Sequence, residues 1–397
     1  MAILAMLFVV PGVSAASPAS ASASAAAIAK PLLIEVSNPI ALQRSDEVLA
    51  VPLEQLLQRR PQWRQRELVV RVAGTPRLLL SQRYASSGGL PDTLLVQLDI
   101  APHATVQLEI QPVAMSPLAT NELYARKVPE RDDDFAWENA QVAYRIYGPG
   151  LQAKGEVSSG IDVWSKRSSH QVINDWYRRD RESQRLGDPS LSYHVDNGVG
   201  LDSYDVGHSP GAGGTAAWVD GKPVYSKNMT QARITAMGPV RLRFEVDYAP
   251  WRAGNALVRE HKVITLDAGS HMNRQRVSYR LEGMPRLIMA AGVAVHAGAQ
   301  VAHVGAARIA IWDTPQKSTA GRIATALIVP PQEGARYVDG DDVAWALFDI
   351  SNGSTIEFAS GAGWSKGDMP DFSAWQRYLD DYRQRWASPL RVRWLDR

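Results

Sequence analysis

The stretch ARITAMGPVRLRFEVDYAPW, residues 232–251, decides the fold class. In its second half, apolar residues alternate strictly with charged ones from Val240 to Tyr248. A period of two is that of a β-strand with one face buried and the other in water. The segments ALVREHKVITLDA (256–268) and HMNRQRVSYRLEG (271–283) repeat the pattern after short glycine-containing turns. The three segments together predict an antiparallel meander.

Further strand-like segments follow between residues 287 and 364, among them RIAIWD and VAWALFDI. They are too many for one sheet, so we expect two or more large antiparallel sheets packed face to face. Helices are few. Residues 168–182, with a serine available as the cap, and residues 371–386, with an acidic start, have the apolar spacing of amphipathic helices lying on the sheets.

The sequence predicts two domains. Residues 30–115 hold short alternating strands such as RELVVRVAG and TLLVQLDI, which predict a small β-sandwich. A polar stretch from 116 to 134 forms the boundary, and residues 122–397 form the large β domain. The sequence is therefore predicted to be mainly β.

Residues 1–29 are predicted to be a signal peptide followed by a leader rich in alanine and serine. The apolar run 2–10 is far shorter than a membrane span of ~20 residues. Val13-Ser14-Ala15 has the small-x-small spacing of a cleavage site. We expect an exported protein, periplasmic or secreted, without a membrane anchor after cleavage.

Composition excludes several classes of protein. The net charge of +2 gives no electrostatic footprint for nucleic acid, and the absence of cysteine excludes thiolate metal sites and cysteine nucleophiles. No P-loop, GxSxG elbow or complete dinucleotide-binding motif occurs. The segment DNGVGLDSYD matches a calcium loop poorly and no zinc spacing is present, so we expect neither a metal nor a cofactor.

The segment SYHVDNGVGLDSYDVGHSPGAGG, residues 192–214, is the predicted floor of a site. Its glycines allow sharp turns that project ionisable side chains into a cleft. A neutral imidazole beside a carboxylate is a suitable general base near neutral pH, and a tyrosine is a suitable acid. The predicted catalytic residues are His194, His208, Tyr204, Asp202 and Asp205.

Nearby tryptophans, arginines and carboxylates have the chemistry of a carbohydrate site, since sugar rings stack on aromatic faces and hydroxyls need polar partners. The predicted substrate-binding residues are Trp137, Arg145, Asp162, Trp164, Lys166 and Arg252. For β-elimination on a uronate, Arg145, Lys166 or Arg252 is expected to neutralise the carboxylate. His194 or His208 would take the proton, Tyr204 would protonate the leaving oxygen, and Asp202 or Asp205 would orient the histidine.

Other functions stay open at this point. A mutarotase-like isomerase needs only an acid and a base, which the same loop supplies. A non-catalytic module would bind polysaccharide through its tryptophans. A glycoside hydrolase would use two carboxylates such as Glu138 and Asp162.

A set of arginines lies on the predicted meander. These side chains either line a cationic groove for an acidic sugar or pair across strands with Glu245, Asp247 and Glu282, the simpler explanation. They are Arg241, Arg243, Arg274, Arg276 and Arg280.

Several motifs resemble a known family. FAWENAQVAYRIYGPG (135–150), GIDVWSKR (160–167) and YHVDNGVGLDSYDVGHSPGAGGTAAW (193–218) resemble the bacterial domain-of-unknown-function family numbered 4861. IEVSNPIALQRSDEVLAVPL (34–53) is similar to its N-terminal phrase, and SYRLEG (278–283) to a later strand.

The resemblance implies an exported component of uronic-acid polysaccharide breakdown, pectin in particular. It also implies a large domain similar to the mutarotase and lyase supersandwiches. The expected ligand is an acidic sugar or oligosaccharide. The family brings no established catalytic residues, and the sequence leaves the oligomeric state open.

Overall fold

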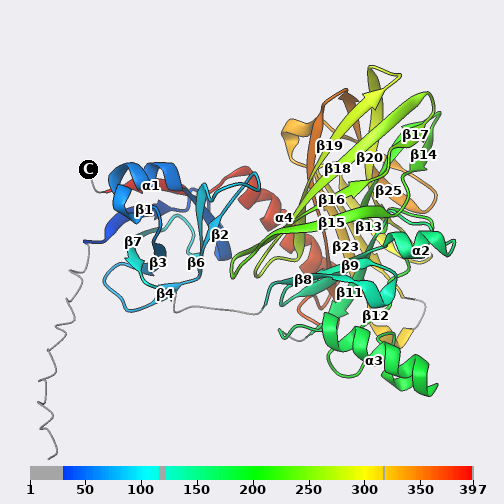
Figure 1. Cartoon of the computed structure of the whole chain (residues 1–397), viewed down its shortest axis with the longest axis horizontal. Coiled ribbons are helices and arrows are strands. Elements are labelled where there is room, and N and C mark those ends of the chain that lie inside the picture. Colours follow the sequence, from blue (N-terminus) through cyan, green and yellow to red (C-terminus); the bar gives the residue numbers. More distant parts are fainter. Residues whose placement is uncertain (1–29, 116–121, 168, 316–317, 396–397) are drawn as a thin grey trace, which may run out of the picture.

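The computed structural model describes residues 30–115, 122–167, 169–315 and 318–395. It consists of a small β domain beside a large one, and the predicted mainly-β fold is confirmed (Figure 1). The predicted signal peptide and leader, residues 1–29, lie outside the described residues. No helix in the described part is both long and apolar enough to cross a membrane.

The small domain packs two sheets around an apolar core, with helix α1 (Leu53–Arg59) beside them. One sheet has the order β27 (Arg391–Trp394), β1 (Leu32–Ser37), β7 (Thr105–Val113), β3 (Glu67–Val72) and β4 (Leu78–Leu79). The other has the order β2 (Arg44–Pro52), β6 (Thr93–Ile100) and β5 (Ser81–Tyr84).

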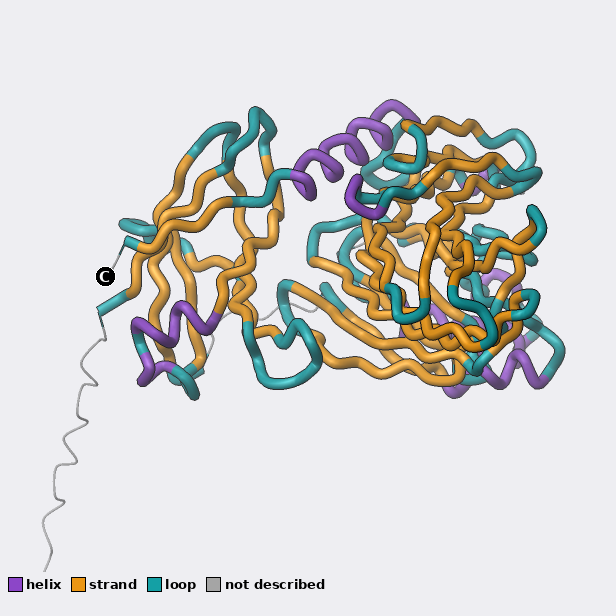
Figure 2. Tube along the Cα trace, turned by 90° about the horizontal axis from the view of Figure 1, so that it is seen from above, coloured by secondary structure: helices purple, strands orange, loops and turns teal. Residues whose placement is uncertain are grey.

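The C-terminal strand corrects the predicted domain boundary. β27 pairs antiparallel with β1, with Ile34 opposite Trp394. Helix α4 (Phe372–Ala387) leads the chain from the large domain back to the small one (Figures 1 and 2). The large domain therefore does not extend to residue 397, because the last strand completes the small sandwich.

The large domain contains three sheets. The first has the order β12 (Gly200–Asp202), β11 (Ile161–Lys166), β10 (Val142–Ile146), β9 (Asp134–Glu138) and β8 (Tyr124–Val128). The second has the order β14 (Lys222–Tyr225), β13 (Ala212–Val219), β20 (Arg286–Ala294), β25 (Val343–Ser351) and β24 (Arg336–Asp339). The third, nine-stranded sheet has the order β15 (Met229–Met237), β16 (Arg241–Tyr248), β18 (Ala256–Asp267), β19 (Met272–Glu282), β26 (Thr355–Trp364), β23 (Ile323–Ile328), β22 (Arg308–Asp313) and β21 (Gln300–Val304), with β17 (Trp251–Ala253) paired to β18.

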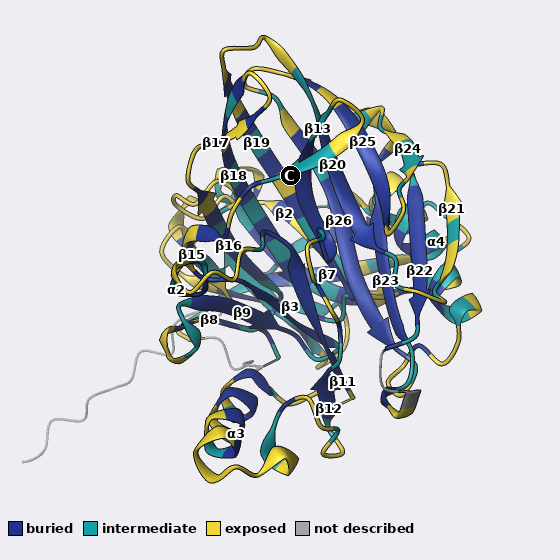
Figure 3. Ribbon diagram, turned by 90° about the vertical axis from the view of Figure 1, so that its right-hand side faces the viewer, coloured by how far each residue is buried: buried dark blue, intermediate teal, exposed yellow. Residues whose placement is uncertain are grey.

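The nine-stranded sheet packs against both smaller sheets, which gives the expected supersandwich (Figure 3). The alternation in β18 appears directly as burial of every second residue from Ala256 to Leu266. One core lies between this sheet and the β8–β12 sheet and includes Phe135 and Phe244. The other lies against the β13–β20–β25 sheet and includes Phe348 and Phe358.

Both predicted amphipathic helices are present, but only one of them begins where the sequence predicted. α4 begins as expected, since Asp371 accepts a hydrogen bond from the backbone of Ala374 at 2.7 Å. α3 (Ile173–Leu186) begins five residues after the predicted start at 168 and has no side-chain cap of its own. It packs on the outer face of the β8–β12 sheet. The short helix α2 (Pro149–Ala153) follows β10.

Candidate functional site

A cavity of about 430 Å³ lies where the glycine-rich segment meets the nine-stranded sheet. Its walls come from the residues after β12, the turn after β20, the end of β22 and the start of β23. The lining residues are Ser203, Tyr204, Asp205, His296, Ala297, Asp313, Thr314, Pro315 and Ile323.

His296 and Asp313 form a charged pair in this cavity. His296 stands two residues after the end of β20, and Asp313 is the last residue of β22. The His296 Nδ1 atom contacts Asp313 Oδ2, and its Nε2 atom lies 2.7 Å from the backbone oxygen of Asp205. Both partners accept hydrogen bonds, so the geometry favours an imidazolium that donates from both nitrogens. Consistently, the hydrogen bond to Asp313 raises the pKa of His296.

Three polar atoms of the lining residues are buried without a hydrogen bond of ordinary geometry to the described residues. They are the Ser203 hydroxyl, the Tyr204 hydroxyl and the Asp313 Oδ1 atom. Burial, together with the negative charges of Asp313 and Asp162, raises the pKa of Tyr204 well above its usual value. Tyr204 is thus a protonated donor and Asp313 an acceptor. Neither atom has its hydrogen-bonding capacity met within the described part of the protein, which makes both candidates for contact with a ligand.

A second charged cluster lies behind Tyr204. Arg145 is surrounded by three buried carboxylates: its Nη2 atom is 2.7 Å from Asp162 Oδ2 and 3.8 Å from Asp202 Oδ2, and its Nε atom is 4.0 Å from Asp134 Oδ2. Arg145 cannot neutralise all three of these carboxylates by itself. Burial, followed by the charge of Asp162, raises the pKa of Asp202 well above its usual value, and burial raises that of Asp134 to about 6. The cluster therefore tends to retain a proton.

The glycines of the predicted site allow close packing of the backbone. A Cβ atom on Gly200, whose φ is +136°, would lie 2.0 Å from the Ser165 oxygen on β11. A Cβ on Gly213, with φ of +111°, would lie 2.2 Å from the Ser360 side chain on β26. The segment is wedged between sheets at these two points. It therefore projects Tyr204 from a fixed backbone.

The structure divides the predicted catalytic residues between several places. Tyr204 and Asp205 line the cavity, although Asp205 contributes its backbone oxygen to His296. Asp202 and His194 belong to the Arg145 cluster, where His194 Nδ1 lies 3.0 Å from the Asp202 backbone oxygen. His208 is exposed and is not among the cavity-lining residues.

Among the predicted substrate-binding residues, Arg145 and Asp162 hold each other. Arg145 is buried against these carboxylates and does not line the cavity, so its position does not match its predicted role toward a substrate carboxylate. Trp137 and Trp164 are fully buried, so they offer no stacking face. The Trp137 indole donates to Asn273 at 2.9 Å, and Trp164 packs beneath α3. Arg252 is exposed on β17 and does not line the cavity.

Lys166 and Glu138 form a structural pair instead of a binding site. Lys166 Nζ donates to Glu138 Oε2 at 2.7 Å and to the backbone oxygens of Asn139 and His170. Glu138 also accepts the backbone N–H groups of Val172 and Ile173 at the start of α3. This carboxylate caps the helix, which explains why α3 needs no local serine. Because both carboxylate oxygens of Glu138 already accept hydrogen bonds, this residue is not available for the role that the hydrolase alternative gave it.

His296 and Asp313 were not predicted as site residues from the sequence. Each follows a buried apolar run, VAVHAG in one case and RIAIWD in the other. A polar residue directly after a buried apolar run was the available signal. Their pairing across 17 residues depends on the sheet arrangement. Within the described residues, no group of three histidine, aspartate or glutamate side chains is arranged to hold a metal ion.

Comparison with known proteins assigns the chain to a family. The family described as Domain of unknown function (DUF4861) matches residues 36–392, which is nearly the whole chain. The chain belongs to this family. It is 29% identical over 376 residues to "Uncharacterized protein P7" of Formosa agariphila, covering 91% of this chain and 92% of that protein.

The DUF4861 chain also resembles larger solved structures. One is a protein in the glycosyl hydrolase family 38 from Enterococcus faecalis, with a TM-score of 0.52 and 10% identity, covering 93% of this chain and 48% of that one. An α-mannosidase from Enterococcus faecalis V583 matches with a TM-score of 0.49 and 9% identity, covering 93% and 46%. The DUF4861 chain spans about half the length of these structures, and the first likeness concerns the fold alone.

Proposed function

We propose that the protein is an exported enzyme that acts on an acidic sugar or oligosaccharide by abstracting the proton next to its carboxyl group. The observation that carries the proposal is the buried pair of unsatisfied atoms, Tyr204 Oη and Asp313 Oδ1, in a cavity that also holds the His296 cation. An acid, a base and a positive charge in one site are what this reaction requires.

The roles differ from those expected from sequence. Asp313 Oδ1 takes the C5 proton, while the positive charge of His296 stabilises the negative charge that develops on the carboxyl group. The electron pair forms the C4–C5 double bond as the C4–O bond breaks, and Tyr204 gives its proton to the leaving oxygen. If the C4–O bond stays intact and Tyr204 gives its proton to C5 in place of the one that Asp313 took, the outcome is isomerisation at C5.

The substrate class has two supports. The volume of about 430 Å³ is within the range of roughly 300–1,000 Å³ usual for small-ligand sites. The similarity of the fold to that of a glycosyl hydrolase supports a sugar as the substrate. That the sugar is a uronic acid is inferred from the resemblance of the sequence motifs to the family. The buried tryptophans give no support to the non-catalytic binding module.

The test is incubation of the purified protein with uronic-acid oligosaccharides in D₂O, followed by ultraviolet absorbance and product mass. New absorbance of an unsaturated uronate indicates elimination. Deuterium at C5 without new absorbance indicates isomerisation. Tyr204→Phe and Asp313→Asn are each expected to lower kcat/KM by about 10²–10⁴-fold, as for loss of a general acid or base.

His208→Ala is the matched control, because His208 is exposed and outside the cavity. We expect its activity to equal that of the wild type. Activity that survives both Tyr204→Phe and Asp313→Asn would contradict the proposal. So would an activity lost in His208→Ala alone.

A further inference from the structure

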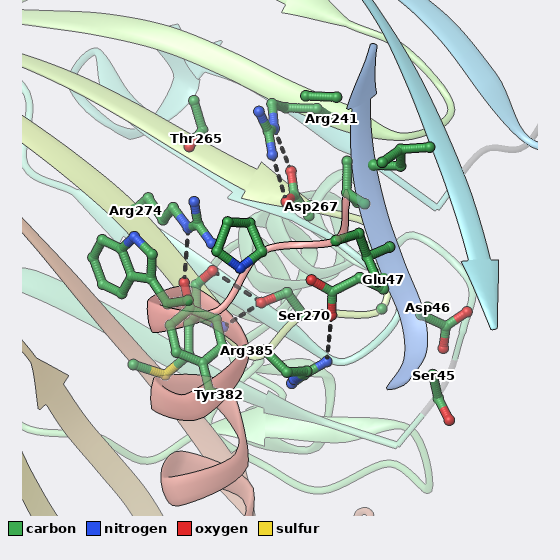
Figure 4. A pocket seen from close by; sticks show the side chains of 18 of the residues that line it. Ser45, Asp46, Glu47, Arg241, Thr265, Asp267, Ser270, Arg274, Tyr382 and Arg385 are labelled. Carbon is green, nitrogen blue, oxygen red and sulfur yellow. Dashed lines mark hydrogen bonds and ion pairs between the residues drawn. The ribbon is translucent and has the colours of Figure 1, made fainter. Parts of the chain in front are cut away.

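A second cavity lies between the two domains and has a volume of about 390 Å³. β2 of the small domain forms one wall, the β16, β18 and β19 strands form another, and α4 forms the third. Figure 4 shows Arg274 and Tyr382 facing Glu47 and its neighbours on β2. None of these residues lines the cavity of Tyr204.

Two of the three arginines in this cavity already have carboxylate partners. Arg241 binds Asp267 through two hydrogen bonds of 2.5 and 2.7 Å. Arg385 lies 3.4 Å from Glu47, which links α4 to the small domain. The Arg241 pair is cross-strand, as the simpler explanation expected, although its partner is Asp267 and not one of the three predicted carboxylates.

Arg274 is different. Its Nε atom donates to the Tyr382 hydroxyl at 3.1 Å, and its guanidinium lies 4.7 Å from the ring centre of Trp386. Among the described carboxylates, none is within ion-pair distance of it. Its position is fixed by aromatic rings, while none of the described carboxylates forms an ion pair with it. That arrangement suits an anionic ligand.

The remaining walls carry hydroxyl groups and an aspartate. Ser45, Thr265 and Ser270 line the cavity together with Asp46, an acceptor for ligand hydroxyls. Burial raises the pKa of Asp46. A ligand that combines one negative group with several hydroxyls matches this set of partners better than a simple ion does.

The domain contact holds the walls in place. Gln82 of β5 donates to the Arg241 backbone oxygen at 3.1 Å and accepts the Arg241 N–H at 2.8 Å. Gln97 donates to the Ala268 oxygen at 2.9 Å. A Cβ on Gly269 would lie 2.6 Å from that of Asp46, so the domains touch closely beside the cavity.

We propose that this interdomain cavity is a second binding site, in which Arg274 binds the negative group of an acidic saccharide. The site uses residues separate from those of the proposed reaction. Its test therefore does not depend on turnover.

Isothermal titration of the full chain with galacturonate oligosaccharides tests the proposal, using the Asp313→Asn variant to prevent turnover. Arg274→Gln introduced into that background is expected to weaken binding at least ~10-fold, the usual effect of losing a charge-assisted hydrogen bond. Arg276→Gln, two residues along β19 and outside the cavity, is the matched control and leaves affinity unchanged. Trp386→Leu, which removes the ring beside Arg274, is expected to weaken binding as well.

Two further probes separate the ligand classes. Neutral galactose oligosaccharides and inorganic sulfate are each expected to bind at least ~10-fold more weakly than the galacturonates, because each lacks one of the two required features. Equal affinity for either probe overturns the saccharide assignment, and so does binding that neither Arg274→Gln nor Trp386→Leu alters. Arg274-dependent binding without any turnover in the wild type keeps this site and rejects the proposed reaction.

Discussion

The Glu138–Lys166 pair and the region around Tyr204 both contain residues predicted from the sequence to belong to a site. They differ in whether their buried polar atoms have hydrogen-bond partners. Glu138 and Lys166 have their hydrogen bonds satisfied by each other, by backbone oxygens and by the start of α3. In the cavity, Tyr204 Oη and Asp313 Oδ1 are buried without hydrogen-bond partners among the described residues, and in the Arg145 cluster the same holds for Asp134 Oδ2. Saturated charge stabilises a fold, whereas unsaturated buried charge is a candidate for binding and catalysis.

The largest effect is expected from breaking the saturated region. Glu138→Ala leaves Lys166 as a buried charge without its ion-pair partner and uncaps α3, so we expect a loss of about 3–5 kcal/mol in the free energy of unfolding. Urea denaturation followed by circular dichroism measures it. Glu182→Ala, on the exposed face of α3, is the control and should change little. A loss as small as that of the control would show that the pair is not structural.

A second prediction concerns Asp134, whose titration should make the free energy of unfolding depend on pH. Burial raises the pKa of Asp134 to about 6 in the folded state, against 3.8 as its ordinary value. The folded state therefore binds the proton more tightly. This contribution to stability is complete below pH ~4 and is lost as the pH rises to ~6, amounting to about 3 kcal/mol.

Asp134→Asn removes that titration. Its Oδ1 can still accept the Gly148 N–H, which lies 2.7 Å from Asp134 in the wild type. Relative to the wild type, the variant is expected to be more stable at pH 7 than at pH 4 by up to about 3 kcal/mol. Chemical denaturation at the two pH values tests this. The same stability difference at both values would contradict the assignment.

The smallest stability change is expected at Tyr204. Because its hydroxyl has no partner, Tyr204→Phe should keep the free energy of unfolding within about 1 kcal/mol of the wild type. Tyr144→Phe is the matched control: the Tyr144 hydroxyl donates to the His271 oxygen at 2.7 Å in the core. Its loss should cost about 1–3 kcal/mol because that oxygen is left unsatisfied. If both variants lost a similar amount of the free energy of unfolding, the Tyr204 hydroxyl would not differ from a hydrogen-bonded core hydroxyl, and the prediction would be wrong.

The amino-acid sequence by itself determined the features that have a local period or a local partner. The alternation in residues 240–248 and 256–268 predicted the strands β16 and β18, because side chains of a strand alternate between its faces. Asp371 predicted the start of α4, since its cap is three residues away. The segment 192–214, predicted to be the floor of a site, supplies Tyr204 to the cavity, and its catalytic role stays a prediction.

Only the tertiary structure decided which of these groups meet. Tyr204, His296 and Asp313 come from three separate parts of the chain and share one cavity through the stacking of the sheets. Glu138 caps a helix that begins 35 residues later, and the last strand joins the first domain. Such contacts have no period and no fixed spacing, because the path between them is set by sheet order and packing. A single sequence reveals the residues that can carry a charge, whereas the packed fold determines which charges remain unsatisfied.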